Sequence, residues 1–596
     1  LDNSYRNRTD PAVTVKFEIA EGQGDLSGAK FLIWTTTPWT LPSNLACAAG
    51  AEITYAILEK DGERLILSAN AIEKYKKQLD GFEQAGTVTG AELKGLRYHP
   101  PFDYFAGHEN AHQILNADFV TDEDGTGIVH LAPGFGEDDL NACRAAGIAV
   151  VVPVDQAGKY TSEIPDYEGL LVFEANKPIT DRLKAEGKLF RHDTYDHNYP
   201  HCWRTDEPLI YKAVDSWYLR VSDFRERMVE LNQEINWAPA HVKDGIFGNW
   251  LAGAQDWNIS RSRFWGTPIP VWVSDDPNYP RTDVYGSIEE LERDFGVKVT
   301  DLHRPHIDAL TRPNPDDPTG KSTMRRVEDV FDVWFDSGSM PYAQVHYPFE
   351  NKDWFEANFP ADFIVEYVAQ TRGWFYTLMV LSTMLFDRPP FRNAICHGVV
   401  LDENRQKLSK RLRNYPDPLN FFDEYGSDVM RWFLISAPVL NGGDLLVPKE
   451  GREIASVQRE AIAPLMNAYS FFSLYANLEE RAPQIITAAD DPLDRYILTK
   501  TGELAGRVGA ALDDYDIPKA ARETVSYFDA LTNWYIRRSR ARFWGSEAEA
   551  SKNAAFDTLY TVLVKACRIC APLLPIVTEK LYKSLTGERS VHLTLW

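Results

Sequence analysis

A strongly apolar segment flanked by two short apolar runs is the feature that most restricts how this chain can fold. Arg372 to Phe386 has the length and composition of a buried helix. Phe363-Ile364-Val365 before it is typical of a buried strand, and Ile395 to Leu401 after it is typical of a second strand. A strand, a helix and a strand in this order predict an α/β domain around residues 362–401.

The size of the chain leaves room for more than that domain. Its 596 residues allow three or four domains at ~150 residues each, and 44% hydrophobic content argues against disorder. No apolar stretch reaches the ~18 residues of a membrane-spanning helix, and we expect no membrane partner. No signal peptide is visible, and six cysteines are too few for a disulfide scaffold. A cytoplasmic protein is therefore expected.

Two further regions have different patterns. From about Phe31 to Pro153 the chain carries short apolar runs bounded by Gly, Pro and Asp, which predicts a β-rich domain. These runs are Phe31 to Trp34, Gly127 to His130 and Ala149 to Val152. Beyond about Glu453 apolar residues recur at helical spacing, which predicts a helical domain. Arg312 to Thr319 is rich in Pro and Asp and is expected to be a surface excursion.

Charge is unevenly distributed along the sequence. The net charge of −24 disfavours general binding of polyanions such as DNA. The helical region nevertheless holds a dense basic cluster with interleaved aromatic residues, namely Trp534, Arg537, Arg538, Arg540 and Arg542. Arginine beside aromatic rings suits phosphate and base contacts in RNA. The same pattern fits a solvated helix face equally well.

The sharpest chemical motif is a lysine-rich segment, Lys407-Leu408-Ser409-Lys410-Arg411. It follows the strand ending at Leu401 and the turn Asp402 to Asn404. Two lysines three residues apart on such a loop can close over a triphosphate and stabilise charge that develops there. Taken alone the pattern is weak, because basic runs on loops are usually solvated.

In context, this motif resembles the signature loop of class I aminoacyl-tRNA synthetases, with Leu408 where Met is commoner and Arg411 where Ser is commoner. Further blocks resemble the isoleucyl-tRNA synthetases of the eukaryote-like bacterial type. These blocks are Asn258 to Pro270, Asp332 to Gly338, Glu366 to Trp374 and Asn414 to Pro418. The resemblance runs from about Trp34 to Trp596. Valyl and leucyl enzymes share the architecture, but their counterparts of the Trp334 and Gln370 blocks differ.

The resemblance implies ATP-dependent activation of isoleucine and its transfer to tRNA(Ile), with Mg²⁺ as the accompanying ion. It places Lys407, Ser409 and Lys410 in catalysis, with Lys410 at the ATP phosphates. It also implies that Trp334 and Trp374 shape the amino-acid pocket, and that His397, Glu366 and Gln370 line the adenylate site. Ala369 departs from an Asp that is common at this position. Trp534, Arg537, Arg538 and Arg540 are the expected tRNA contacts.

A second site is implied near the start of the chain. The family carries an inserted editing domain that hydrolyses mischarged valine, and the matching residues are Thr35, Thr36, Thr37, Asn44, His130 and Asp139. Asp139 is expected to hold the α-amino group, the threonines to orient water, and His130 to exclude isoleucine. Isoleucine and valine differ by one methylene, and this pair is the standard example of the problem. A single apolar pocket discriminates too weakly between them, so a second site that hydrolyses the smaller product is needed.

Three domains follow from this interpretation. We expect a β-rich editing domain at 1–204, the C-terminal half of a class I Rossmann-like catalytic domain at 205–450 with a connective insertion at about 275–325, and an incomplete α-helical anticodon-binding domain at 451–596. No His-Ile-Gly-His type motif is present, so the first half of the catalytic domain is expected to precede Leu1.

Some alternatives stay open at this stage. Cys567 and Cys570 form a lone C-x-x-C, and His201-Cys202 has no second pair at ligand spacing, so no complete zinc site is expected. The rival functions are a valyl-tRNA synthetase and a synthetase-derived tRNA-binding protein without activation activity. A monomer is expected.

Overall fold

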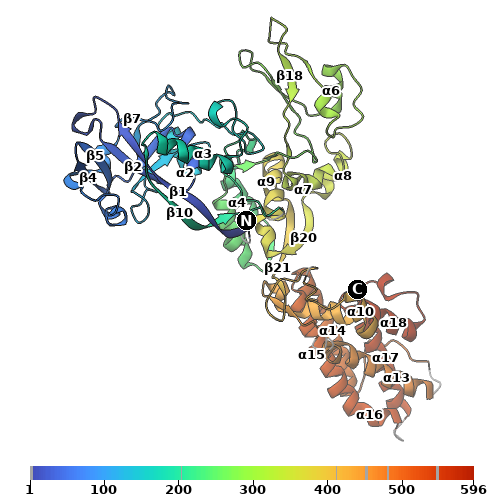
Figure 1. The fold of residues 1–596 in the computed structure, drawn as a ribbon. Coiled ribbons are helices and arrows are strands. Elements are labelled where there is room, and N and C mark those ends of the chain that lie inside the picture. Colours follow the sequence, from blue (N-terminus) through green and yellow to red (C-terminus); the bar gives the residue numbers. More distant parts are fainter. Residues whose placement is uncertain are drawn as a thin grey trace. The chain divides into compact units, whose positions relative to one another are not determined.

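The computed structural model describes residues 4–202, 205–410, 412–449, 454, 456–478, 482–544 and 549–596. These residues form two compact units, Leu1–Asp215 and Ser216–Trp596, which are described separately below. Figure 1 shows the elements of both units. No helix among the described residues is long and apolar enough to cross a membrane.

The first unit is built on a seven-stranded mixed sheet. Its strand order is β10-β1-β2-β5-β4-β6, and β7 pairs with β1. The strands are β1 (Tyr5–Ile19), β2 (Lys30–Thr35), β4 (Thr54–Lys60), β5 (Glu63–Ser68), β6 (Glu83–Thr89), β7 (Tyr98–His99) and β10 (Leu189–Pro200). Val13, Val15 and Ile33 pack into one apolar cluster, and Leu32, Leu65 and Leu67 pack into another, so both faces at the centre of this sheet are covered.

A smaller sheet in the same unit has the order β8-β3-β9, with β3 at Ala46–Ala49, β8 at Ile114–Asn116 and β9 at Ile128–Leu131. Three α-helices, α1 (Gly90–Leu93), α2 (Glu137–Ala145) and α3 (Val172–Ala185), complete the unit. The predicted strands at Phe31 to Trp34 and Gly127 to His130 are confirmed. The one predicted at Ala149 to Val152 is wrong, because this segment pairs with no strand and the Ala149 carbonyl accepts a bond from the His108 ring instead.

The second unit contains the predicted α/β region. A parallel three-stranded sheet has the order β12-β21-β20, formed by Asn236–Ala238, Phe391–His397 and Ala361–Tyr367. Helix α9 (Trp374–Phe386) connects β20 to β21, as the sequence predicts. The strand predicted at Ile395 to Leu401 is broken, because the ladder of β21 ends at His397 and β22 (Val400–Asp402) pairs with β23 (Leu445–Val447).

The expectation that Phe363-Ile364-Val365 is a buried strand is wrong in one respect. Strand β20 lies at the edge of the described sheet, and only Ile364 packs against the core under α9. Phe363 and Val365 point to the opposite face and are 51% and 46% exposed. An apolar run therefore indicated a strand here, but it did not distinguish a strand covered on both faces from one covered on a single face.

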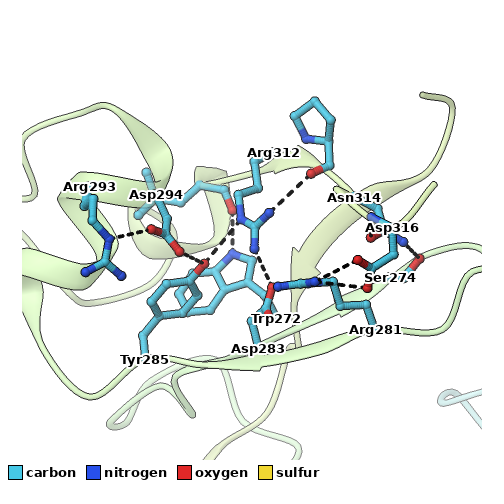
Figure 2. Close-up of polar contacts among 12 residues, drawn as sticks. Trp272, Ser274, Arg281, Asp283, Tyr285, Arg293, Asp294, Arg312, Asn314 and Asp316 are labelled. Atoms are coloured by element: carbon cyan, nitrogen blue, oxygen red, sulfur yellow. Dashed lines mark hydrogen bonds and ion pairs between the residues drawn. The ribbon is translucent and has the colours of Figure 1, made fainter. Parts of the chain in front are cut away.

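Residues 271–326 form a separate small sheet with the order β16-β15-β18-β17. Its strands are β15 (Val271–Ser274), β16 (Thr282–Val284), β17 (Arg312–Pro313) and β18 (Thr323–Arg326), with α6 at Ile288–Phe295. Figure 2 shows polar contacts here, including that of Arg312 with Asp283. The indole N–H of Trp272 also donates to the Leu310 carbonyl (2.7 Å). The segment Arg312 to Thr319 was expected to be a surface excursion. Its first two residues instead pair with β18, and Asn314 is buried.

The remaining elements of this unit surround the α/β sheet or form the helical body, which consists of the helices between Ala463 and Thr586. Short strands β11 (Tyr218–Leu219), β13 (Trp257–Asn258), β14 (Ser260–Arg261) and β19 (Val330–Phe331) precede the helix α7 (Val333–Ala343). Other helices of this part are α4 (Arg225–Gln233), α5 (Gly248–Ala252), α8 (Lys352–Asn358), α10 (Pro418–Tyr425) and α11 (Ser427–Ser436). The helical body has one continuous apolar core that also includes Trp432 of α11.

The helical body confirms the prediction of a helical region beyond Glu453. Its described helices are α13 (Ala463–Leu478), α14 (Pro492–Asp513), α15 (Ile517–Asp529), α16 (Arg537–Trp544), α17 (Glu549–Cys570) and α18 (Pro575–Thr586). Asp428 of α11 accepts hydrogen bonds from the backbone N–H groups of Ile576 and Val577 (3.1 and 2.7 Å). This carboxylate satisfies N–H groups in the first turn of α18 and ties that helix to α11.

Candidate functional site

A hydroxyl and imidazole network lies immediately after β2 in the first unit. The chain leaves the strand at Thr35 and enters a tight helical turn at Pro38–Ser43. Thr35 Oγ1 lies 3.2 Å from Thr37 Oγ1, which lies 3.3 Å from Thr40 Oγ1. Thr40 Oγ1 in turn lies 2.7 Å from His130 Nε2. The turn therefore aligns three hydroxyl groups that end on a histidine ring.

The hydrogen bonds around His130 define its tautomer. Asn44 Nδ2 approaches His130 Nδ1 at 3.4 Å, so Nδ1 accepts and the ring proton sits on Nε2. The Thr40 hydroxyl donates to the Thr37 carbonyl (2.9 Å), which leaves its oxygen free to accept from His130 Nε2. Burial lowers the pKa of His130 to about 4. The ring is therefore neutral at physiological pH.

Asp139 is bonded to the backbone just after the C-terminal end of β9. His130 lies on β9, and two residues later the Ala132 N–H donates to Asp139 Oδ2 (2.9 Å) from the first turn of α2. Burial raises the pKa of Asp139 to about 6, although the Ala132 N–H opposes this shift. The carboxyl group is thus mostly ionised at neutral pH but is held close to its point of titration.

Gly136 is required at the start of α2 for a steric reason. A Cβ at this position would lie 2.9 Å from the Asp139 Cγ atom, closer than side chains tolerate. Without a Cβ at Gly136, the backbone at the start of α2 can lie next to the Asp139 carboxyl group.

The structure brings most of the expected editing residues together. Thr35, Thr37, Asn44 and His130 share the network above, with Thr36 half-buried between the two threonines. Asp139 does not share this network and is bonded to the Ala132 N–H, two residues after His130. The sequence analysis missed Thr40 as a site residue. The signal for it was its spacing of three from Thr37, which places both hydroxyls on one face of a tight helical turn.

The residues expected to shape the amino-acid pocket lie where α7 and α9 meet in the second unit. The Trp374 backbone N–H donates to Gln370 Oε1 (2.8 Å), and its indole N–H donates to the Ser337 carbonyl (2.9 Å). A Cβ on Gly373 would lie 3.3 Å from the Trp334 ring and 2.4 Å from Gln370 Oε1. Trp334, Gln370 and Trp374 are therefore neighbours, and Trp334 is still 40% exposed.

Glu366 and His397 lie on adjacent parallel strands close to the carboxyl ends. Glu366 is paired in register with Cys396, and Tyr367 with His397. The His397 ring donates from Nδ1 to the Gly398 carbonyl (2.7 Å). Ligands of open α/β sheets bind beyond the carboxyl ends of the strands. Both residues are therefore placed at the appropriate sheet edge.

The lysine segment lies beyond β22. Lys407 and Lys410 are exposed, and neither forms an ion pair with a described residue. The backbone beneath them is held by Asp402 and Asn414, through bonds that include Asn414 Nδ2 to Asp402 Oδ2 (2.7 Å) and Ser409 N–H to Asn414 Oδ1 (3.0 Å). Arg411 lies outside the described residues.

The basic cluster divides into two groups in the structure. Trp534, Arg537, Arg538 and Arg540 are exposed, and the Arg538 guanidinium lies 4.6 Å from the Trp534 ring centre. Arg542 belongs to this cluster by sequence but was not among the expected tRNA contacts. Its side chain is buried and makes two hydrogen bonds to the fully buried Asp494 (2.9 and 2.8 Å).

Metal-binding chemistry has little support in the described part of the chain. No group of three or more His, Cys, Asp or Glu side chains there could hold a metal ion. Cys567 and Cys570 lie one helical turn apart on α17 and are buried. Burial raises the pKa of Cys570 to about 12, so this thiol is protonated at physiological pH and is a poor metal ligand.

The chain is similar to known proteins over most of its length. Residues 18–445 match the family described as tRNA synthetases class I (I, L, M and V), and residues 494–596 match the anticodon-binding domain of tRNA ligase. The "Isoleucine--tRNA ligase" of Rickettsia canadensis is 58% identical, with 98% of this chain and 55% of that protein covered. That of Corynebacterium efficiens is also 58% identical, with 100% and 57% covered.

A solved structure gives a weaker likeness. The LeuRS of Agrobacterium radiobacter K84, in a ternary complex with tRNA and LeuAMS, matches at a TM-score of 0.43 and 16% identity, covering 99% of this chain and 62% of that one. The chain spans about half the length of the curated relatives named above. Because the family match covers most of its residues, the chain belongs to the class I tRNA synthetases of the I, L, M and V group.

Proposed function

We propose that the complete protein is an isoleucine--tRNA ligase that activates isoleucine with ATP and transfers it to tRNA(Ile). The observation that carries this proposal is the 58% identity, over 98% of the chain, to a relative of that name. In the reaction, the isoleucine carboxylate attacks the α-phosphorus of ATP and pyrophosphate leaves. A ribose hydroxyl of the tRNA then attacks the adenylate carbonyl, and AMP leaves. Both steps need positioning and charge compensation rather than covalent catalysis.

The aromatic group at α7 and α9 is the proposed pocket for the isoleucine side chain. Trp334 and Trp374 offer apolar ring surface to a branched aliphatic group. The bond from the Trp374 N–H to Gln370 Oε1 (2.8 Å) fixes the start of α9 and the Gln370 side chain together. We assign Glu366, Gln370 and His397 to the adenylate side, where the parallel strands end.

The proposed role of Lys407 and Lys410 is to bind the phosphates and to offset the negative charge that grows on pyrophosphate as it leaves. Ser409 lies between them and donates its N–H to Asn414. Because neither ammonium group is ion-paired to a described residue, both are available to a triphosphate, and their effect is largest where charge develops in the transition state.

The family also implies Mg²⁺ alongside ATP. The described residues contain no preformed group of three or more acidic, histidine or cysteine ligands. A magnesium ion held mainly by substrate phosphates needs only one or two protein carboxylates, so this finding fits an ion that arrives with ATP. When bound, such an ion would neutralise phosphate charge.

Unit Leu1–Asp215 is proposed to hydrolyse valine from tRNA(Ile). The Asp139 carboxylate would bind the α-ammonium group of the ester, because ionised partners make the stronger hydrogen bonds. Thr35, Thr36, Thr37 and Thr40 would orient a water molecule toward the ester carbonyl. Water then adds to this carbon, the ribose oxygen leaves with a proton, and free valine is released. Neutral His130 fixes Thr40 and narrows the site against isoleucine.

The helical body is proposed to bind the tRNA through Trp534, Arg537, Arg538 and Arg540. Exposed guanidinium groups beside an exposed indole suit phosphate contacts and base stacking. We accordingly assign 1–204 to editing, 205–450 to the second part of the catalytic domain and 451–596 to anticodon binding. The last assignment is supported by the family match over residues 494–596.

The deciding experiment is pyrophosphate exchange by the complete gene product with isoleucine or valine as the amino acid. A much higher kcat/KM with isoleucine supports the proposal. Faster exchange with valine would identify a valine enzyme instead. Absence of exchange together with retained tRNA binding would identify a binding protein derived from a synthetase. Hydrolysis of Val-tRNA(Ile) by this chain tests the editing assignment separately.

A further inference from the structure

The lysine segment is part of a hairpin-like loop whose backbone is organised by side chains outside it. Asp402, the last residue of β22, accepts hydrogen bonds at Oδ1 from the N–H groups of Asn404 and Gln406 (2.9 and 2.8 Å). Its own backbone N–H donates to the Gln406 carbonyl (2.8 Å). One carboxylate oxygen therefore holds the turn that leads into Lys407.

Asn414 closes the loop from the other side. Its Nδ2 group donates to Asp402 Oδ2 (2.7 Å) and to the Lys407 carbonyl (3.2 Å), and its Oδ1 accepts from the Ser409 N–H (3.0 Å). An amide side chain has two N–H donors and one carbonyl acceptor, and here every kind of group is used. The hydrogen bond from Asn414 also lowers the pKa of Asp402, which keeps this carboxyl group ionised.

These bonds fix the backbone of the loop, whereas the charged side chains that it carries are exposed. The backbone of Lys407 and that of Ser409 are both bonded to the Asn414 amide, while the side chains of Lys407 and Lys410 stay exposed. Arg405 adds a more distant tie, because its guanidinium donates to Asp444 (3.1 Å). Groups that stabilise developing charge act best when their positions are set before the reaction, because no reorganisation is then needed.

We propose that Asp402 and Asn414 form a latch that holds the backbone of the lysine segment in one conformation at Lys407 and Ser409. Both are positioning residues, since neither would touch the substrate. This inference rests on the proposed function for its consequence in catalysis, but the latch itself is a property of the chain.

Limited digestion with trypsin tests the latch without any activity measurement. Trypsin needs a locally open backbone, and Lys407 and Lys410 are exposed cleavage sites inside the loop. Asn414→Ala removes all three side-chain bonds and is expected to raise cleavage after these lysines by about tenfold or more. Asn404→Ala is the matched control, because this exposed neighbour contributes only its backbone N–H to the loop.

A side-chain swap makes the test sharper. Asp402→Asn and Asn414→Asp each place two like groups face to face, and each should loosen the loop. The double variant reverses donor and acceptor, so the contact between the two side chains, the bonds to Asn404 and Gln406 and the bond from Ser409 can all re-form. Only the bond to the Lys407 carbonyl is lost. The double variant should therefore be digested more slowly than either single variant.

The same variants in the complete gene product report on catalysis. With isoleucine and ATP, Asn414→Ala should lower kcat for pyrophosphate exchange by about tenfold while KM for isoleucine stays unchanged, and the swap should recover part of kcat. Digestion of Asn414→Ala at the wild-type rate, with a wild-type circular dichroism melting profile, would overturn the latch. So would a swap no slower in digestion than the single variants. A latch that responds in an enzyme without exchange activity would instead refute the proposed function.

Discussion

Thr40 Oγ1 and His130 Nε2 lie 2.7 Å apart, and this contact links the turn after β2 to the strand β9. The two residues are 90 positions apart in sequence, so the contact exists only in the folded unit. The Thr40 hydroxyl donates its proton to the Thr37 carbonyl, so the Thr40 oxygen is free to accept a hydrogen bond. This oxygen is the acceptor of the His130 N–H in the network. The orientation of the ring and that of the threonine row are therefore coupled.

Thr40→Val should break this coupling with almost no change in shape. The buried His130 N–H would lose its acceptor, which costs about 1–3 kcal/mol of unfolding free energy. Hydrolysis of Val-tRNA(Ile) should slow by about tenfold or more, while isoleucine activation stays normal. Urea unfolding and a deacylation assay measure the two effects. Thr54→Val, at an exposed position on β4, is the control. Deacylation at the wild-type rate would remove Thr40 from the site.

The sequence identified the segments that carry this site but not their connections. Thr35 to Thr37 and His130 were expected because they match the family's editing domain, and the strands that carry them leave local signals in the sequence. Thr40 was missed because its role depends on the distant His130. The burial of Arg542 was not predicted for the same reason, since its partner Asp494 lies 48 residues away. Phe363 was expected to be buried because an apolar run does not reveal which sheet face is covered.

Asp139 gives a prediction that separates stability from activity. Its folded pKa of about 6 lies above the unfolded value of 3.8, so the folded state binds the proton more tightly. This contribution to stability is fully present below pH 3.8 and is lost as the pH rises through 6. Asp139→Asn should therefore stabilise the chain at pH 7, by on the order of 1–3 kcal/mol, while deacylation of Val-tRNA(Ile) is strongly reduced. Thermal unfolding and deacylation assays decide this.

The pH dependence of the same reaction provides an independent check. Deacylation should fall as the pH drops through about 6, where Asp139 takes up its proton. The charge of neighbouring Asp138 contributes to the raised pKa of Asp139. Asp138→Asn should therefore move the midpoint of the pH profile to lower pH without abolishing activity. A midpoint that does not respond to this change would show that another group controls the profile.

Lys410→Ala should lower pyrophosphate exchange by the complete protein about a hundredfold, because a cation at the leaving pyrophosphate is lost. The KM for isoleucine should change little, since Lys410 lies on the loop beyond β22 rather than between α7 and α9. Lys352→Ala, at the exposed start of α8, controls for the loss of one positive charge. Exchange at the wild-type rate in the Lys410 variant would exclude this lysine from the mechanism.

Arg540 and Arg542 lie two residues apart on α16, and their replacement should affect different properties. Replacing Arg542 should lower stability, whereas replacing Arg540 should weaken tRNA binding. Arg542→Ala leaves the buried Asp494 carboxylate without its two guanidinium bonds and should cost about 3–5 kcal/mol of unfolding free energy.

Arg540→Ala removes an exposed charge and should change stability by less than about 0.5 kcal/mol. It should instead weaken tRNA binding and reduce the salt dependence of that binding, because a phosphate contact is lost. Chemical unfolding and tRNA titrations at two salt concentrations measure both quantities. If Arg540→Ala leaves the affinity and its salt dependence unchanged, the exposed arginines are only a solvated helix face, which is the alternative that the sequence left open.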